Sequence, residues 1–287
     1  MIILENEKLK ASLHPLGAEL QSLYHKDFGL EYIWNGKPDV WPRHSPVLFP
    51  IVGGLKEDSF YYKGEKYTLA KHGFARDTEF EVESASDAKA SFTLKSTKET
   101  LKSFPFDFLL RITYALEADR TIVTYEVENT SAESMYFSIG THPAFNVPLI
   151  EGTAYSDYFL EFEKEENSVR HTLNGNILNG TVPYLQNQNK LRLEESLFYD
   201  DAVIFKDLKS NSISIKTDKS PHGIGFNFEG FPYMGIWAAK DAPFVCIEPW
   251  CGLPDSKNHN QQIEDKEGII SLDASTNWSN SWSLHCF

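Results

Sequence analysis

Two titratable residues in strand-like segments could exchange protons with a bound ligand. His142 lies in the segment SIGTHPAFN (138–146), where Pro143 removes a backbone donor and favours an extended chain just before it. An imidazole at such a strand end can face a cleft and exchange protons near neutral pH. The alternative is a hydrogen-bonded histidine of the core, which is the more common environment of a lone histidine.

Glu248 is the second candidate, because it places a carboxylate in the otherwise apolar segment VCIEPW, just before Pro249. Burying an acid among such neighbours is costly unless the acid has a use. Partial burial would raise its pKa and make it a usable general base. The alternative is a glutamate at a strand edge that reaches water.

Two basic segments could help to bind the ligand. His72 and Arg76 lie in KHGFARD, where Gly73 allows a tight turn or a close approach of the backbone to a ligand. Arg43 precedes SPVLFP in a second segment of this kind. For all three side chains the alternative is an exposed turn with a solvated charge.

An acidic pair and an aromatic residue complete the set of candidates. Asp201, which follows Asp200 in FYDDAVIF, could accept hydrogen bonds from a polyol, or it could belong to an acid pair at a strand edge. Trp237 in GIWAAKDAP is by default a core aromatic, but an indole can also stack on the apolar face of a sugar.

Several familiar cofactor and metal motifs are absent. The three cysteines and the histidines near them do not have zinc-site spacing, and the chain lacks H-E-x-x-H and G-x-S-x-G. It also lacks a phosphate-binding loop and the G-x-G-x-x-G fingerprint. We therefore expect a protein that uses neither a cofactor nor a metal.

Composition restricts the class of protein further. The formal net charge of −14 disfavours binding to nucleic acid and to anionic membranes. The N-terminal segment lacks the apolar core of a signal peptide, no apolar run could cross a bilayer, and three cysteines do not suggest a disulfide framework. These features predict a cytoplasmic protein.

The candidate residues must be positioned by β-strands, because apolar residues recur with a period of two. The segments 106–116 and 121–129 alternate around the polar link EADR, which indicates an antiparallel hairpin. The same pattern predicts strands in SFTLKS, NSISIKT, IGFNFEG and FVCIEPW, and a hairpin in YYKGEKYTL. STKETLKSF and RLEESLF could each form a helical turn or two.

The polar stretch from 167 to 189 is rich in Asn and Gly, and we expect long loops or loose hairpins there. Strands resume on both sides of it, so it does not mark a domain boundary. The sequence predicts an all-β protein with one domain over residues 1–287, built from antiparallel strands in two packed sheets.

Six segments in this order resemble the aldose 1-epimerase (galactose mutarotase-like) superfamily, and within it the LacX-like subgroup. The segments are PVLFPIVGGLK, HGFARD, GTHPAFN, FYDDAVIF, FPYMGIW and FVCIEPWCGLPD. The resemblance implies a large antiparallel β-supersandwich. It also implies an enzyme that interconverts the α and β anomers of a free aldose without a cofactor.

The resemblance implies roles for individual residues. His142 would protonate the ring oxygen of the sugar, and Glu248 would take the proton from the anomeric hydroxyl. His72 would bind the substrate together with Arg76, and Asp201 would contact a sugar hydroxyl. Many relatives carry an arginine where this chain has Gly54, so either Arg43 or Arg76 replaces it or binding is weaker.

Two other functions stay open at this point. One is a sugar-binding or regulatory module without turnover, which Gly54 favours. The other is a mutarotase of hexose 6-phosphates, which needs several cations at one end of the cleft, and the candidates are Arg43, His44, Lys56, His72 and Arg76. The sequence is compatible with a monomer or a homodimer.

Overall fold

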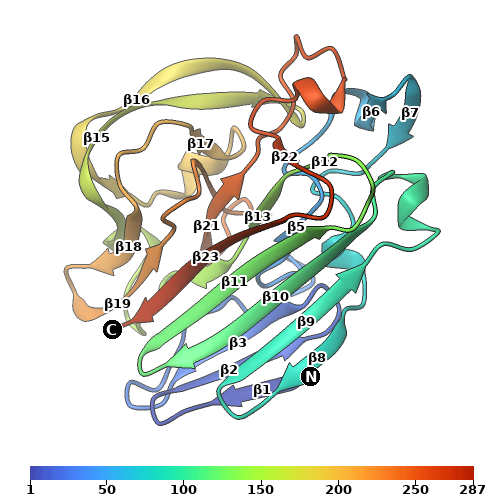
Figure 1. The fold of residues 1–287 in the computed structure, drawn as a ribbon. Coiled ribbons are helices and arrows are strands. Elements are labelled where there is room, and N and C mark those ends of the chain that lie inside the picture. The colour runs from blue at the N-terminus through green and yellow to red at the C-terminus, as the bar shows by residue number, and fades with distance from the viewer.

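Twenty-three β-strands make up most of the chain in the computed structural model, which describes all residues from 1 to 287 (Figure 1). Four of them form a separate N-terminal sheet: β1 (Ile2–Glu5), β2 (Leu9–His14), β3 (Glu19–His25) and β4 (Leu30–Glu31). Two small two-stranded sheets pair β6 (Ser59–Tyr62) with β7 (Glu65–Thr68) and β12 (Met135–Phe137) with β22 (Ile270–Leu272).

The remaining 15 strands form one large sheet. Its main path runs through β5 (Val47–Leu48), β13 (Ile139–Thr141), β21 (Phe244–Cys251), β20 (Tyr233–Trp237), β17 (Val203–Phe205), β15 (Tyr158–Asn174), β18 (Ser212–Thr217), β19 (Ser220–Asn227), β23 (Asn277–Cys286), β11 (Arg120–Asn129), β10 (Phe108–Glu117), β9 (Lys89–Lys95) and β8 (Glu81–Ala85). Off this path, β14 (Ala144–Asn146) pairs with β21 and β16 (Ile177–Arg192) pairs with β15.

Helices are limited to short 3₁₀ turns. They are η1 (Lys56–Asp58), η2 (Ala75–Asp77), η3 (Thr100–Lys102), η4 (Tyr155–Asp157), η5 (Glu195–Phe198) and η6 (Ile263–Asp265). The turns η3 and η5 confirm the predicted helical turns. None of these helices has the length and apolar character needed to span a membrane.

The predicted hairpin over residues 106–129 is confirmed as β10 and β11. Phe108 pairs with Asn129 and Leu116 with Thr121, and buried residues alternate with more exposed ones along both strands. The strand period of two therefore places one apolar face against the core and leaves the other face partly solvated. The neighbouring strands are antiparallel throughout, as the sequence predicted.

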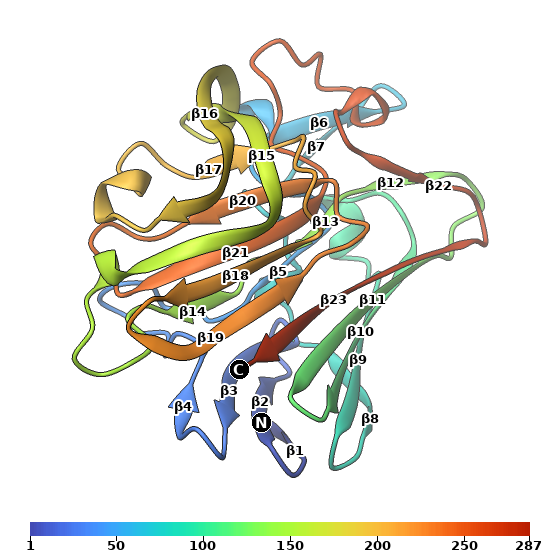
Figure 2. The same ribbon diagram turned by 90° about the vertical axis from the view of Figure 1, so that its left-hand side faces the viewer.

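The large sheet folds around a common core. Figure 2 shows β8–β11 and β15–β21 on two sides of the molecule, joined through β19 and β23, and β1 contacts both β9 and β10. A cluster of 67 buried apolar residues fills the interior. Its aromatic members include Phe49, Phe104 and Phe108, whose rings pack edge to face at centroid distances of 5.0–6.0 Å. This arrangement is the β-supersandwich that the resemblance implied.

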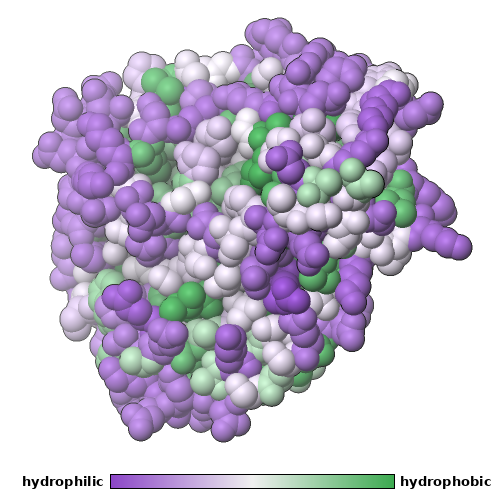
Figure 3. Space-filling model, in the orientation of Figure 1, coloured by the Kyte–Doolittle hydropathy of each residue, from purple (hydrophilic) through white to green (hydrophobic).

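Residues 167–189 are not loops but the outer parts of two long strands. β15 and β16 form a hairpin of 17 and 16 residues whose pairing is interrupted by register shifts. Most of β16 is exposed on both faces, so it lacks the apolar alternation that identifies a half-buried strand. Figure 3 shows a mostly hydrophilic surface in this upper left part of the molecule. Of the two expected forms, the hairpin is correct and the long loop is not.

Candidate active site

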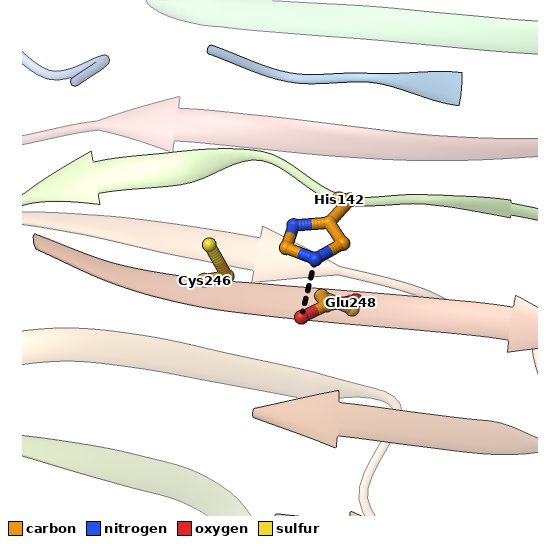
Figure 4. Close-up of side chains that lie close together, drawn as sticks. All are labelled: His142, Cys246 and Glu248. Carbon is orange, nitrogen blue, oxygen red and sulfur yellow. Dashed lines mark ion pairs between the residues drawn. The ribbon is translucent and has the colours of Figure 1, made fainter. Parts of the chain in front are cut away.

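Two short strands hold His142 opposite Glu248. β13 and β14 both pair with β21 in one register, because Gly140 faces Trp250 and Ala144 faces Cys246. His142 therefore stands across from Glu248, at the break between β13 and β14 where Pro143 cannot donate to the ladder. The Nε2 atom of His142 lies 3.2 Å from Oε1 of Glu248 (Figure 4). Residues 106 positions apart in the chain (248 − 142) are thus brought into contact.

Burial makes both members of this pair favour their neutral forms. His142 is 8% exposed and Glu248 is 2% exposed. Loss of solvation lowers the pKa of His142 to about 3. It raises the pKa of Glu248 well above its ordinary value, and the positive charge of Lys71 opposes that rise. The pair therefore holds one exchangeable proton between nitrogen and oxygen, and the resting state carries no net charge.

His142 and Glu248 both line a cavity of about 700 Å³. Its lining also includes the predicted residues His72, Arg76, Asp201 and Trp237, which come from three different segments of the chain. Arg43 is not part of the lining. Its guanidinium instead pairs with Asp77 at 2.8 Å, and Asp77 also lies 3.6 Å from Nε of Arg76.

The floor of the cavity depends on a tryptophan between two glycines. Trp250 follows Glu248 on the same face of β21, because alternate residues of a strand share a face. A β-carbon at Gly235 would lie 2.4 Å from the indole, and one at Gly140 would lie 2.6 Å from it. Only glycine on both neighbouring strands leaves room for this ring.

The tautomer of His72 is set by the backbone. Its Nδ1 accepts a hydrogen bond from the N–H of Gly53 at 3.1 Å, so the ring proton resides on Nε2. Burial lowers the pKa of His72 well below its ordinary value, with the nearby His142 as a smaller cause, and the ring is therefore neutral. A neutral imidazole with this tautomer offers one hydrogen-bond donor to a ligand.

One wall of the cavity is basic. Arg76 donates from Nη2 to the carbonyl of Lys71 at 2.8 Å, which braces the loop that carries both side chains. The ammonium group of Lys71 makes no hydrogen bond or ion pair within the protein, although Lys71 lines the cavity. Lys71 carries no signal in the sequence, since a lysine in a Gly-containing turn has the ordinary appearance of a solvated charge.

Another part of the cavity lining is acidic and rich in amides. Asp201 accepts a hydrogen bond from the N–H of Ala202 at 2.7 Å through one oxygen, Oδ1. The end of β15 adds Asn174 to the lining, and the turn that follows adds Asn176. A β-carbon at Gly54 would lie 2.5 Å from that of Asn176, so the hairpin occupies the space that a side chain at position 54 would need.

Aromatic rings surround His142. The indole of Trp41 stacks on the imidazole with a centroid distance of 5.1 Å and an angle of 27° between the planes. Trp237 meets it edge to face at 5.6 Å. Trp41 lies two residues before Arg43 and lines the cavity, but its residue type carried no such signal in the sequence.

An acid and a base side by side, in a cavity with donors and acceptors on its walls, can move protons on a polyhydroxylated ligand. The deep end offers the His142–Glu248 pair and aromatic surface. The walls offer His72 as a donor and Asp201 as an acceptor. The arrangement fits proton transfer better than nucleophilic attack, because the motifs for an activated nucleophile are absent from the sequence.

Comparisons with known proteins agree with these features. Residues 1–264 match the family model described as Aldose 1-epimerase. The chain is 36% identical over 282 residues to the protein LacX of Lactococcus lactis subsp. lactis, with 94% of both chains covered. It is similar to a crystal structure of a galactose mutarotase related enzyme from Lactobacillus acidophilus, with a TM-score of 0.94, 34% identity, and coverage of 99% and 96% of the two chains. A galactose mutarotase-like protein from Lactobacillus casei also superposes with a TM-score of 0.94, at 35% identity and full coverage of both chains.

Proposed function

This chain belongs to the aldose 1-epimerase family, and on that premise we propose that it interconverts the α and β anomers of a free aldose. The contact between Nε2 of His142 and Oε1 of Glu248 at the cavity wall carries the proposal. Ring opening of a hemiacetal removes a proton from the anomeric hydroxyl and delivers one to the ring oxygen. Both oxygens are bonded to the same carbon, so an acid and a base that lie side by side can reach both.

The protonation state of the pair suits this reaction. In the working form Glu248 is a carboxylate and His142 is protonated, which requires only that the shared proton move across the 3.2 Å contact. Glu248 then accepts the hydroxyl proton as His142 protonates the ring oxygen. This gives the open-chain aldehyde and returns both side chains to their neutral forms. After rotation about the C1–C2 bond, the same steps run backward and close the ring on the other face.

We propose that the other cavity residues hold the sugar. His72 donates through Nε2, Asp201 accepts from a hydroxyl through its second carboxylate oxygen, and Trp237 covers an apolar face of the ring. Arg76 reaches the sugar from the basic wall. Arg43 acts at one remove, because its contact with Asp77 helps to fix the loop that carries Arg76.

Replacing the base tests the proposal. Glu248→Gln keeps the shape of the side chain but cannot accept the proton, so anomerisation should fall to the buffer rate while sugar binding survives. Polarimetry or NMR on freshly dissolved α-glucose and α-galactose measures the rate, and calorimetry measures binding. The matched control is Glu166→Gln, since Glu166 is equally buried but does not line the cavity. A wild-type rate no higher than that of buffer over a broad sugar panel would contradict the catalytic proposal.

A phosphorylated hexose is a second candidate substrate, and the free ammonium group of Lys71 favours it. Of the five cations expected from the sequence, only His72 and Arg76 line the cavity. The other three are engaged: Arg43 with Asp77, Lys56 with the carbonyl of His259, and His44 beside Glu19. Comparing glucose with glucose 6-phosphate, in the wild type and in Lys71→Met, distinguishes the two substrate classes. Calorimetric binding without any rate enhancement would select the regulatory module instead.

A further inference from the structure

The proposed proton-transfer reaction makes no use of Cys246, although its thiol lies beside the acid–base pair. Cys246 and Glu248 alternate with Ile247 on β21 and so share one face of the strand. Figure 4 shows the thiol rising from the strand next to the imidazole of His142. One ligand atom from each of the three residues lies within 4.8 Å of the other two.

We propose that His142, Cys246 and Glu248 form a binding site for a borderline-soft divalent cation such as Zn²⁺, and that the bound ion blocks proton transfer. Imidazole, thiolate and carboxylate are the three side-chain groups that zinc sites use. A thiolate also selects against Mg²⁺ and Ca²⁺, which prefer oxygen ligands.

The distances suit a tetrahedral ion. Zinc–nitrogen and zinc–oxygen bonds of about 2.0 Å place two such ligands about 3.3 Å apart, and a sulfur ligand at about 2.3 Å lies about 3.5 Å from the others. The observed nitrogen–oxygen distance is 3.2 Å. The thiol starts within 4.8 Å, so it needs to approach by at most about 1.3 Å, which a small side-chain rotation supplies.

Charge and access also favour the site. All three side chains are buried, and a lone divalent charge there would be costly. Binding releases one proton from the Glu248 carboxyl group and one from the Cys246 thiol to solvent, and the resulting carboxylate and thiolate neutralise the ion. His142 and Glu248 line the cavity while Cys246 does not, so the ion is reached from the cavity and keeps its fourth position toward that side.

The inhibitory part of this inference rests on the proposed function. A bound ion occupies the lone pair of the imidazole and the charge of the carboxylate, so neither group can then give or take a proton. Ion binding itself does not depend on that function, because it requires only the three side chains.

Metal binding to the whole protein tests the site. Zn²⁺ is titrated against a chromophoric chelator, and Co²⁺ is added to look for the thiolate-to-metal charge-transfer band. We expect one Zn²⁺ per chain, a cobalt–thiolate band, and at least a tenfold loss of affinity together with loss of the band in Cys246→Ala. The matched control is Cys251→Ala, which removes another buried free thiol from the same strand but from its other face. Cys251→Ala should bind like the wild type.

Two results would overturn the site: no stoichiometric binding to the wild type, or equal affinity in the wild type and Cys246→Ala. A further experiment measures anomerisation. Zn²⁺ should inhibit the wild type at a lower concentration than it inhibits Cys246→Ala, and a chelator should restore the rate. Full activity of zinc-loaded wild type would overturn the inhibitory role alone. If the metal-free protein shows no anomerisation, the proposed function fails, and the binding titration still decides the metal site.

Discussion

Two walls of the same cavity are built in opposite ways. On one side β21 is buried along all eight of its residues and is paired on both edges, with β13 and β14 on one and β20 on the other. On the other side β16 is largely exposed, and the register of its pairing with β15 shifts repeatedly. Near its tip, the N–H of Leu178 donates to the carbonyl of Asp255 at 2.8 Å, and the carbonyl of Leu178 accepts from the N–H of Lys257 at 3.1 Å.

The two walls therefore suit different parts of the proposed function. Proton transfer requires an acid and a base whose positions are fixed to a fraction of an ångström, and a buried central strand provides that. The proposed selection among similar sugars requires polar groups at a wall that can change without disturbing the core. Substitutions on β21 and its partners should therefore change the rate of the reaction, and substitutions at the hairpin should change the affinity.

The largest expected effect is at the buried wall. His142→Asn removes the proposed proton donor, so the rate constant should fall by roughly 10²–10⁴-fold with little change in sugar affinity. Exchange NMR gives the rate, and calorimetry gives the affinity. The contrast between the walls would be broken if Asn176→Ala at the hairpin lowered the rate constant by a similar factor.

The second-largest expected difference between the two walls is the effect of added volume on stability. Gly235→Ala places a methyl group 2.4 Å from the indole of Trp250, and such overpacking should lower the free energy of unfolding by about 1–3 kcal/mol. The control is Gly180→Ala in β16, where the nearest atom is 3.5 Å away, and stability should stay equal or rise by up to about 1 kcal/mol. Urea unfolding measures both, and equal losses would contradict the contrast.

The pH dependence of stability offers a third test. Because burial raises the pKa of Glu248, the native state keeps a proton that the unfolded chain releases above pH 4.5, so stability falls as pH rises. The lowered pKa of His142 gives the opposite slope between about pH 3 and 6.5. The two slopes offset each other between pH 4.5 and 6.5, and above pH 6.5 only the Glu248 slope remains.

Glu248→Gln removes that remaining slope. Above pH 6.5 the wild type should lose stability relative to this variant by up to about 1.4 kcal/mol per pH unit, measured by urea unfolding at several pH values. Glu165→Gln changes an exposed residue of β15 and should leave the profile unchanged. Parallel profiles for the wild type and Glu248→Gln would show that the buried Glu248 carboxyl group does not cause the loss of stability at high pH.

The smallest expected effect is at the hairpin. Asn176→Ala removes one amide from the cavity wall, and losing one hydrogen bond to the sugar should cost about 1 kcal/mol, or about fivefold in KM. The rate constant should stay within roughly twofold of the wild type, because the lost hydrogen bond holds the sugar equally in the ground state and the transition state. Steady-state kinetics by polarimetry separates the two parameters, and an unchanged KM would remove the hairpin from substrate selection.

The same contrast explains what could be predicted from the sequence. β10 and β11 were recognisable because each has one buried face, which imposes the apolar alternation. β16 has almost no buried face, so its residues do not differ from those of a loop.

Within the cavity, residue type indicated His142 and Glu248, because a titratable group in an apolar strand is costly to bury unless it has a function. Lys71, Asn174 and Asn176 carry no such signal, because lysines and asparagines are ordinary in exposed turns. Asn174 and Asn176 reach the lining because a distant hairpin approaches the loop around Gly54, and that approach is a tertiary contact without a local pattern.

The glycines on either side of Trp250 restrict how the binding cavity can be redesigned. Shortening Trp250 alone would leave an empty volume above Gly140 and Gly235, and enlarging either glycine alone would collide with the ring. Single-codon saturation at any of these positions should therefore return few functional clones. A mutant library that randomises the three codons together gives directed evolution a route to a reshaped floor and to bulkier sugars.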